Sequence, residues 1–308
     1  MFISEILAIG SATCIALSSM FINELNGRVP LLRLARWQLT SAFLMTALAA
    51  SIAGGWATLG TWQIEALIAS SLAGIVVAST TYFAAIYIAG PRVTALLFSL
   101  ASPFALAFGY LAYGETISRH QGIGIVLILV GIVIAIGMRR RRPAPMMPLA
   151  DPEPVTATAP PTPGPSLLGI TLGVVTALGQ ATGSLLARPA MASGVEPFAA
   201  MAIRSGFAVL CFWAILVLPI GRSKDRSFRP KDLGIAATAA FFGTALGMSL
   251  LMAALTSGNV GLVSTLSSMT PIVILPMVWL RTGQRPRIHA WAGAALAILG
   301  TALISLGA

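Results

Sequence analysis

The chain alternates long apolar segments with short polar connections. Ten segments have the length of about 20 residues that a helix needs to cross the hydrocarbon core of a bilayer. They lie at residues 2–23, 32–53, 64–89, 93–112, 120–138, 166–187, 196–219, 232–256, 260–281 and 288–306. This pattern predicts an all-α integral membrane protein with ten transmembrane helices.

The ten segments form two sets of five, because four polar or conformationally special residues recur 168 positions later. The matched pairs are Arg36 with Arg204, Gly90 with Gly258, Ser99 with Ser267, and Pro103 with Pro271. If each copy holds an odd number of spans, the second copy enters the bilayer from the opposite side. We therefore predict inverted five-helix repeats, residues 1–138 and 166–308, around a midplane site, as in many carriers.

Residues 139–165, between the two repeats, differ in composition from the rest of the chain. They hold nine of the 19 prolines and begin with four arginines, Arg139 to Arg142. Proline removes backbone donors and favours extended conformations. We therefore predict a flexible linker and not a further domain.

Composition excludes a soluble globule. Hydrophobic residues make up 57% and charged residues 9% of the chain, and the mean hydropathy is +0.89, which leaves too little polar surface for solvation. Cys14 and Cys211 stand alone in apolar segments and are expected to be packing residues. Because the sequence contains no hydrolase, zinc-protease or nucleotide-loop motif, we expect no enzyme activity, no catalytic residue, no metal and no cofactor.

Basic residues are unevenly distributed along the chain. Fifteen of the 19 lie in the linker and in the four connections that share its side of the membrane. The positive-inside rule then predicts an inner-membrane protein with a cytoplasmic linker and both chain ends outside. Topology and anionic headgroups account for the net charge of +10, so the expected partners are a small-molecule substrate and membrane lipids, without nucleic acid. We expect a monomer or a weak homodimer.

Several of these features together resemble a known family. They are the two five-span repeats, the arginines Arg36 and Arg204 early in the second span of each, a glycine-led loop into a Ser/Thr-Pro helix, and Gly114-Glu115 before a glycine-rich fifth span. The chain is similar over essentially its whole length to EamA-type transporters of the drug/metabolite transporter superfamily, including exporters of aromatic or hydrophobic amino acids. The second repeat departs from this pattern with Gly283-Gln284. Many members of the family carry both termini in the cytoplasm, opposite to the prediction from charge.

Hydroxyl side chains on the fourth and ninth spans are the first candidates for a substrate site. Ser99 with Ser102, and Ser267 with Thr270, lie three residues apart on one helix face, each pair next to a proline. The prolines, Pro103 and Pro271, each leave an upstream carbonyl without its amide partner and are candidate hinges. Such carbonyls and hydroxyls suit the ammonium and carboxylate of a zwitterion. The competing interpretation is that the hydroxyls join helices and the prolines kink them.

The third and eighth spans supply further candidates for the wall of a cavity. They are Ser79 and Tyr82 in the third span and Thr244 and Met248 in the eighth. A tyrosine and a flexible thioether offer an aromatic or aliphatic group a surface to pack against. Ordinary helix packing competes with this interpretation for Tyr82, and Tyr87 is expected to anchor at the membrane interface.

Two arginines lie inside predicted spans. For Arg36 and Arg204 the favoured interpretation is that the side chains extend to the headgroups, and the competing one is a gate for an anionic substrate group. Gln38 and Gln180 are weaker candidates, because amides in spans commonly bond to neighbouring helices. No carboxylate lies in the middle of a span, so a central carboxylate relay for protons is not expected.

The predicted function is export of small metabolites, foremost aromatic or hydrophobic amino acids, by alternating access. The lack of central charge and the neutral hydroxyls at matched positions favour such a cargo. A multidrug or nucleotide-sugar carrier of the same superfamily is the main alternative. A membrane enzyme or a scramblase without a recognisable motif is a more distant one.

Overall fold

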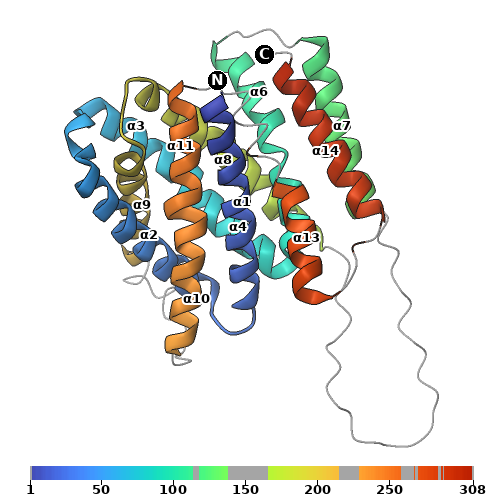
Figure 1. Ribbon diagram of the computed structural model, residues 1–308, viewed down its shortest axis with the longest axis horizontal. Coiled ribbons are helices and arrows are strands. Elements are labelled where there is room, and N and C mark those ends of the chain that lie inside the picture. The colour runs from blue at the N-terminus through green and yellow to red at the C-terminus, as the bar shows by residue number, and fades with distance from the viewer. Residues whose placement is uncertain are drawn as a thin grey trace, which may run out of the picture.

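The structure is a computed structural model that describes residues 2–113, 118–137, 166–214, 229–257, 267, 270–283, 286 and 288–306. All regular elements within these residues are helices (Figure 1). The α-helices are α1 (Phe2–Glu24), α2 (Leu31–Ala53), α3 (Thr61–Ser71), α4 (Ala78–Ala89), α5 (Pro91–Phe98), α6 (Ala101–Tyr113), α7 (Arg119–Gly137), α8 (Leu167–Ala192), α9 (Pro197–Ala214), α10 (Pro230–Ala240), α11 (Met248–Ser257), α13 (Thr270–Thr282) and α14 (Ile288–Leu306). A short 3-10 helix, η1 (Gly55–Thr58), joins α2 to α3, and two π-helices, η2 (Leu72–Val77) and η5 (Phe241–Gly247), complete the elements.

Six helical stretches in the described part are long and apolar enough to cross a membrane. They are Ile6–Glu24, Thr61–Ala89, Pro91–Leu111, Leu167–Ala192, Pro197–Ala214 and Pro230–Thr256. Gly122–Gly131 and Ile288–Gly300 are shorter apolar helices. The all-helical membrane class is therefore confirmed, while the number of ten spans and the linker at 139–165, which lies outside the described residues, stay predictions.

The predicted fourth span is two helices, α5 and α6, separated by a tight turn. The Leu100 amide donates to the Leu97 carbonyl at 3.0 Å, and the Ser102 amide donates to the Ser99 carbonyl at 3.3 Å. These are bonds between residues three apart, in place of the α-helical spacing of four. Pro103 lies in the first turn of α6, where its missing amide hydrogen costs no helical hydrogen bond. Pro271 likewise lies in the first turn of α13.

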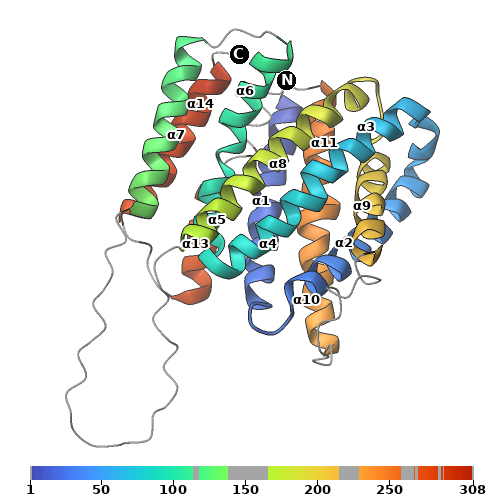
Figure 2. The same ribbon diagram turned by 180° about the vertical axis from the view of Figure 1, so that it is seen from behind.

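Helices from the two halves of the chain pack against each other in antiparallel pairs. A Cβ atom on Gly131 of α7 would lie 2.9 Å from the Ala297 nitrogen of α14, and one on Gly300 would lie 2.9 Å from the Ile128 nitrogen of α7. Since the higher-numbered position of α14 meets the lower-numbered one of α7, the two helices run in opposite directions. Glycines allow this close approach, and Figure 2 shows the pair at one edge of the bundle.

Glycines also join α8 to the stretch formed by α3, η2 and α4. A Cβ on Gly74 would lie 3.0 Å from the Gly183 Cα, and one on Gly179 would lie 3.0 Å from the Ala78 Cβ. The Ser70 hydroxyl donates to the Gly183 carbonyl at 2.6 Å across the same contact. This crossing holds the π-helix η2 directly against α8.

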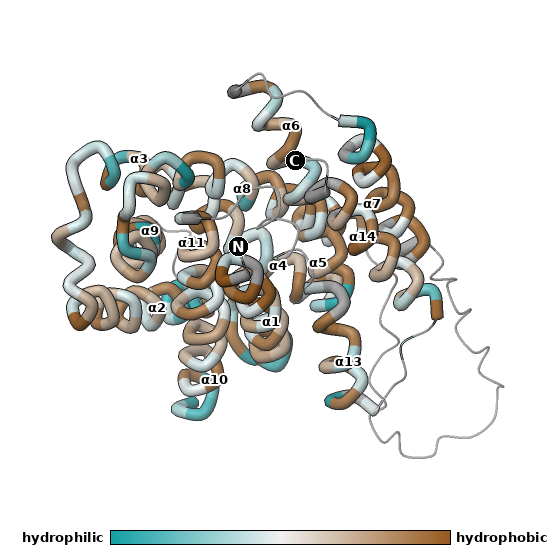
Figure 3. Tube along the Cα trace, turned by 45° about the horizontal axis from the view of Figure 1, so that its top comes forward, coloured by the Kyte–Doolittle hydropathy of each residue, from teal (hydrophilic) through white to brown (hydrophobic). Residues whose placement is uncertain are grey.

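Hydrophilic and hydrophobic residues are separated along the helix axes. Hydrophilic segments gather at helix ends, among them the starts of α7 and α10, while the helix bodies are mainly apolar (Figure 3). The two chain ends lie at one end of the bundle, and the end of α7 and the start of α8 lie at the opposite end (Figure 2). Arg281 of α13 forms an ion pair with Glu24 at the end of α1.

Candidate functional site

A cavity of about 60 Å³ lies in the middle of the bundle. Sixteen residues line it, from α1, α2, η2, α4, α5, α8, η5 and α11. This volume has room for several water molecules, so the cavity is narrow in this conformation. It lies where both halves of the chain meet, because α1, α2, η2, α4 and α5 supply one part of its wall and α8, η5 and α11 supply the other.

Four of the eight predicted substrate-binding residues line this cavity. They are Ser79 and Tyr82 on α4, Thr244 on η5 and Met248 on α11. The structure thus brings together side chains that are more than 160 positions apart in sequence. Their role in binding a substrate stays a prediction.

The other four predicted residues are buried outside the cavity lining. The Ser99 hydroxyl donates to the Ala95 carbonyl at 3.5 Å, and the Thr270 hydroxyl donates to the Ser267 carbonyl at 3.1 Å. The Ser102 hydroxyl has no hydrogen-bond partner among the described residues. In this conformation the Ser99 and Thr270 hydroxyls therefore bond to carbonyls of their own segments.

Two phenylalanines that sequence reasoning did not single out belong to the cavity. Phe98, at the end of α5, and Phe83 both line it. The ring of Tyr82 lies edge-on to that of Phe98, with centroids 5.9 Å apart, and its centroid lies 6.2 Å from that of Phe83. These aromatic rings give the cavity an apolar region. The only feature of the sequence that pointed to it was the position of Phe98 next to the predicted site residue Ser99.

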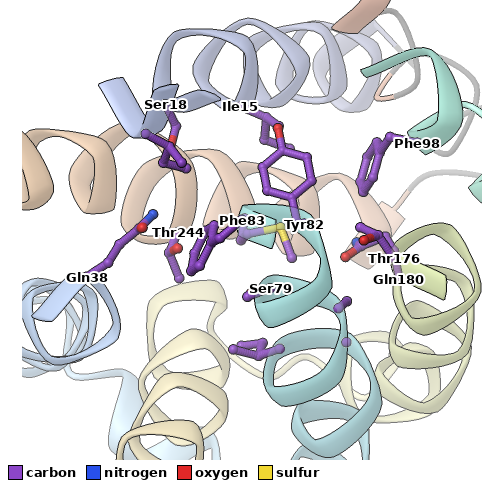
Figure 4. Close-up of a pocket in the computed structure, with 16 residues that line it drawn as sticks. Ile15, Ser18, Gln38, Ser79, Tyr82, Phe83, Phe98, Thr176, Gln180 and Thr244 are labelled. Carbon is purple, nitrogen blue, oxygen red and sulfur yellow. The ribbon is translucent and has the colours of Figure 1, made fainter. Parts of the chain in front are cut away.

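Two amides lie in opposite walls of the cavity. Figure 4 shows Gln38 and Thr244 on one side, Thr176 and Gln180 on the other, and Tyr82 between them. The Gln38 side chain is 1% exposed, and its carbonyl oxygen has no hydrogen-bond partner among the described residues. A buried amide oxygen without a partner is costly, so Gln38 offers an acceptor to a molecule in the cavity.

Both π-helices contribute to the cavity wall. η2 supplies Gly74 and Ile75, and η5 supplies Gly243 and Thr244. A π-helix has a wider hydrogen-bond spacing than an α-helix and is frequent at functional sites. The sequence showed only one glycine in η2 and two in η5, because a single π turn has no strong compositional signal.

The two predicted gate arginines have different surroundings. Arg36 is 8% exposed, and its Nε donates to the Leu32 carbonyl at 3.2 Å. Arg204 is 0% exposed, so the expectation that it extends to the headgroups is wrong. The physical reason is packing: Gly74 of η2, Met201 of α9 and Met252 of α11 lie against the guanidinium. Whether either arginine acts as a gate stays a prediction.

The lining residues carry no formal charge, and no group of three or more His, Cys, Asp or Glu in the described part of the chain is placed to hold a metal ion. A narrow, neutral cavity between packed apolar helices is typical of a small-molecule site inside a helix bundle. The chemistry available to this site is hydrogen bonding and aromatic contact.

Comparison with known proteins identifies the class of this membrane protein. The sequence model of the EamA-like transporter family matches residues 2–137 and 167–306. The chain therefore belongs to the EamA-like transporter family. It is a multi-pass membrane transporter of the drug/metabolite transporter superfamily. Members of the EamA family are transporters and not enzymes.

Two further comparisons bear on the fold. No match is found among curated proteins. A solved crystal structure, described only as that of a protein, superimposes with a TM-score of 0.68 at 16% sequence identity, covering 98% of this chain and 95% of the other. At that identity the similarity shows a shared fold alone.

Proposed function

We propose that this transporter exports small amphipathic metabolites, foremost amino acids with aromatic or hydrophobic side chains, through the central cavity. The observation that supports the proposal is the combination of aromatic rings and neutral polar groups around one cavity. Tyr82 and Phe98 offer an aromatic group edge and face contacts. Gln38 and Gln180 offer an ammonium and a carboxylate hydrogen-bond partners without introducing a net charge.

The same lining residues make a multiply charged cargo unfavourable. A nucleotide sugar carries phosphate charges that a dry site must neutralise with cations. None of the residues that line the cavity is charged. In this conformation the cavity therefore offers the phosphates of a nucleotide sugar no cation.

For the architecture, we propose ten spans in two inverted five-helix repeats. Antiparallel contacts between matched helices support this arrangement: Trp213 of α9 donates to Thr40 of α2 at 3.1 Å, while Ser205 lies beside Thr46 at 3.4 Å. The pairing of α7 with α14 has the same sense. Alternating access would then consist of the two halves rocking about the cavity, with Pro103 and Pro271 as hinges at the starts of α6 and α13.

For orientation, we propose an inner-membrane protein whose linker is cytoplasmic and whose termini are outside. The uneven distribution of basic residues supports this choice. The positions of the helix ends are consistent with it, because the end of α7 and the start of α8 lie at the bundle end opposite the two termini (Figure 2). We further propose that the carrier functions as a monomer or a weak homodimer among membrane lipids, and without nucleic acid.

Transport by the purified full chain tests the proposed function. Proteoliposomes are loaded with labelled phenylalanine, leucine, alanine or a nucleotide sugar, and efflux is followed against empty liposomes. We expect phenylalanine and leucine to leave faster than from empty liposomes and the nucleotide sugar not to. Efflux of the nucleotide sugar alone would contradict the proposal.

A further inference from the structure

We propose that Arg204 binds a carboxylate group of the transported solute. This inference rests on the proposed function, since it names the charged group that the carrier recognises. It starts from an unusual environment for a cation. The Arg204 side chain is fully buried, within an apolar bundle where an unpaired charge is strongly unfavourable.

The polar contacts of this guanidinium are poor. Its Nη1 lies 3.5 Å from the sulfur atoms of Met201 and Met252, and thioether sulfur is a weak acceptor. Its Nε and Nη2 have no hydrogen-bond partner among the described residues. Among the described residues, Arg204 is not paired with a carboxylate.

The two unsatisfied nitrogens lie on the same edge of the guanidinium plane. Nε and Nη2 together form the side-on fork that receives both oxygens of a carboxylate in a bidentate pair. Nη1, on the other edge, is the nitrogen that faces the methionines. The free edge of Arg204 therefore presents two parallel donors, which match the two oxygens of a carboxylate better than the one oxygen of a carbonyl group.

The guanidinium lies directly behind the cavity wall. A Cβ atom on Gly74 of η2 would lie 2.7 Å from the Arg204 Nη2, and Gly74 itself lines the cavity. Gly74, which has no side chain, therefore lies next to both the cation and the cavity. A shift of η2 during the transport cycle would open that edge of Arg204 to a solute.

The order of the groups along the chain suits a solute with a carboxylate at one end and an apolar group at the other. Gly74 and Tyr82 are eight residues apart, about 12 Å along a helix. A carboxylate at Arg204 places the rest of the solute along α4, toward the aromatic rings of Tyr82 and Phe98. The cavity would thus bind the acid group at its η2 end and the apolar group at its α5 end.

Binding of three related compounds to the full chain in nanodiscs tests this assignment. L-phenylalanine and phenylacetate have a carboxylate, and L-phenylalaninamide has an uncharged amide in its place. We expect the parental protein to bind both acids about tenfold or more tightly than the amide, as for a buried charge-assisted pair. Arg204→Met should abolish this preference, and Arg204→Lys, which keeps the charge without the fork, should reduce it.

Arg33→Met is the matched control, because Arg33 lies three residues before Arg36, the counterpart of Arg204 in the other half, and does not line the cavity. It should keep the parental preference. Arg204→Met is expected to unfold at the same or a higher temperature, since a buried unpaired cation is removed. If it does not fold, Arg204→Lys carries the test.

Two results would overturn the assignment: equal binding of the amide and the acids by the parental protein, or the parental preference in every folded Arg204 variant. Failure of the proposed function has a different signature. If proteoliposomes export no amino acid while phenylacetate still binds in a manner that depends on Arg204, the export proposal is wrong and the carboxylate site stands.

Discussion

The Ser18 hydroxyl on α1 donates a hydrogen bond to the Ala239 carbonyl of α10, 2.8 Å away. This bond joins the first helix to the penultimate residue of α10, two residues before the π-helix η5. One turn further on, Gly243 faces the same serine, and a Cβ on this glycine would lie 2.9 Å from the Ser18 Cβ and closer still to its oxygen. The wall of the cavity is therefore packed without room for a methyl group at this point.

Gly243→Ala should lower the thermal stability of the protein. Forcing a methyl group into a filled contact costs about 1–3 kcal/mol, so the unfolding temperature in detergent should fall by several degrees. Adding Ser18→Gly should restore part of the loss. Gly234→Ala is the control, because a Cβ there meets nothing within 4 Å. Equal unfolding temperatures for Gly243→Ala and the parental protein would contradict this packing.

Tyr82→Ala should reduce transport of phenylalanine. An aromatic pair contributes about 0.5–1.5 kcal/mol beyond its buried area, which corresponds to a loss of about threefold to tenfold in efflux rate. Tyr87→Ala is the comparison, since the Tyr87 hydroxyl donates to the Val29 carbonyl at 3.2 Å and Tyr87 does not line the cavity. Tyr87→Ala should lower the stability of the protein more than the efflux rate per folded protein molecule. A parental rate for Tyr82→Ala would remove Tyr82 from the site.

Gln38→Leu should impair transport without destabilising the protein. The change removes a buried amide oxygen that has no partner, so stability should stay level or rise. If that oxygen accepts a hydrogen bond from the solute, its loss should weaken binding by about fivefold to tenfold. Gln63→Leu, on α3 outside the cavity lining, should transport normally. Unchanged efflux by Gln38→Leu would assign this amide to helix packing alone.

Accessibility of single cysteines should reveal the orientation. In a background with Cys14→Ala and Cys211→Ala, we expect Ala57→Cys, exposed in η1 between α2 and α3, to react with an impermeant thiol reagent added to intact cells. Ala150→Cys, in the predicted linker, should react only after the membrane is opened. The reverse result would place the linker outside and both termini in the cytoplasm.

The sequence alone determined the class of this protein, because membrane-length apolar segments and a repeat of 168 residues are visible in one dimension. Proline chemistry is similarly local, so Pro103 and Pro271 could be expected to interrupt helices, and both lie in the first turn of one. Ser79, Tyr82, Thr244 and Met248 could be proposed for the cavity, because polar or polarisable side chains in apolar spans are conspicuous. Family membership followed from the same signals.

Tertiary structure decided which of these side chains line the same cavity. Gln38 and Phe98 reach the cavity from α2 and α5, and nothing in their own segments separates a lining residue from a packed one. Burial of Arg204 depends on η2 and α11 packing against α9, whereas its local sequence favoured extension to the headgroups. The wall of the cavity is assembled from helices distant in sequence, and the free energy of a buried polar group depends on the neighbours that packing supplies.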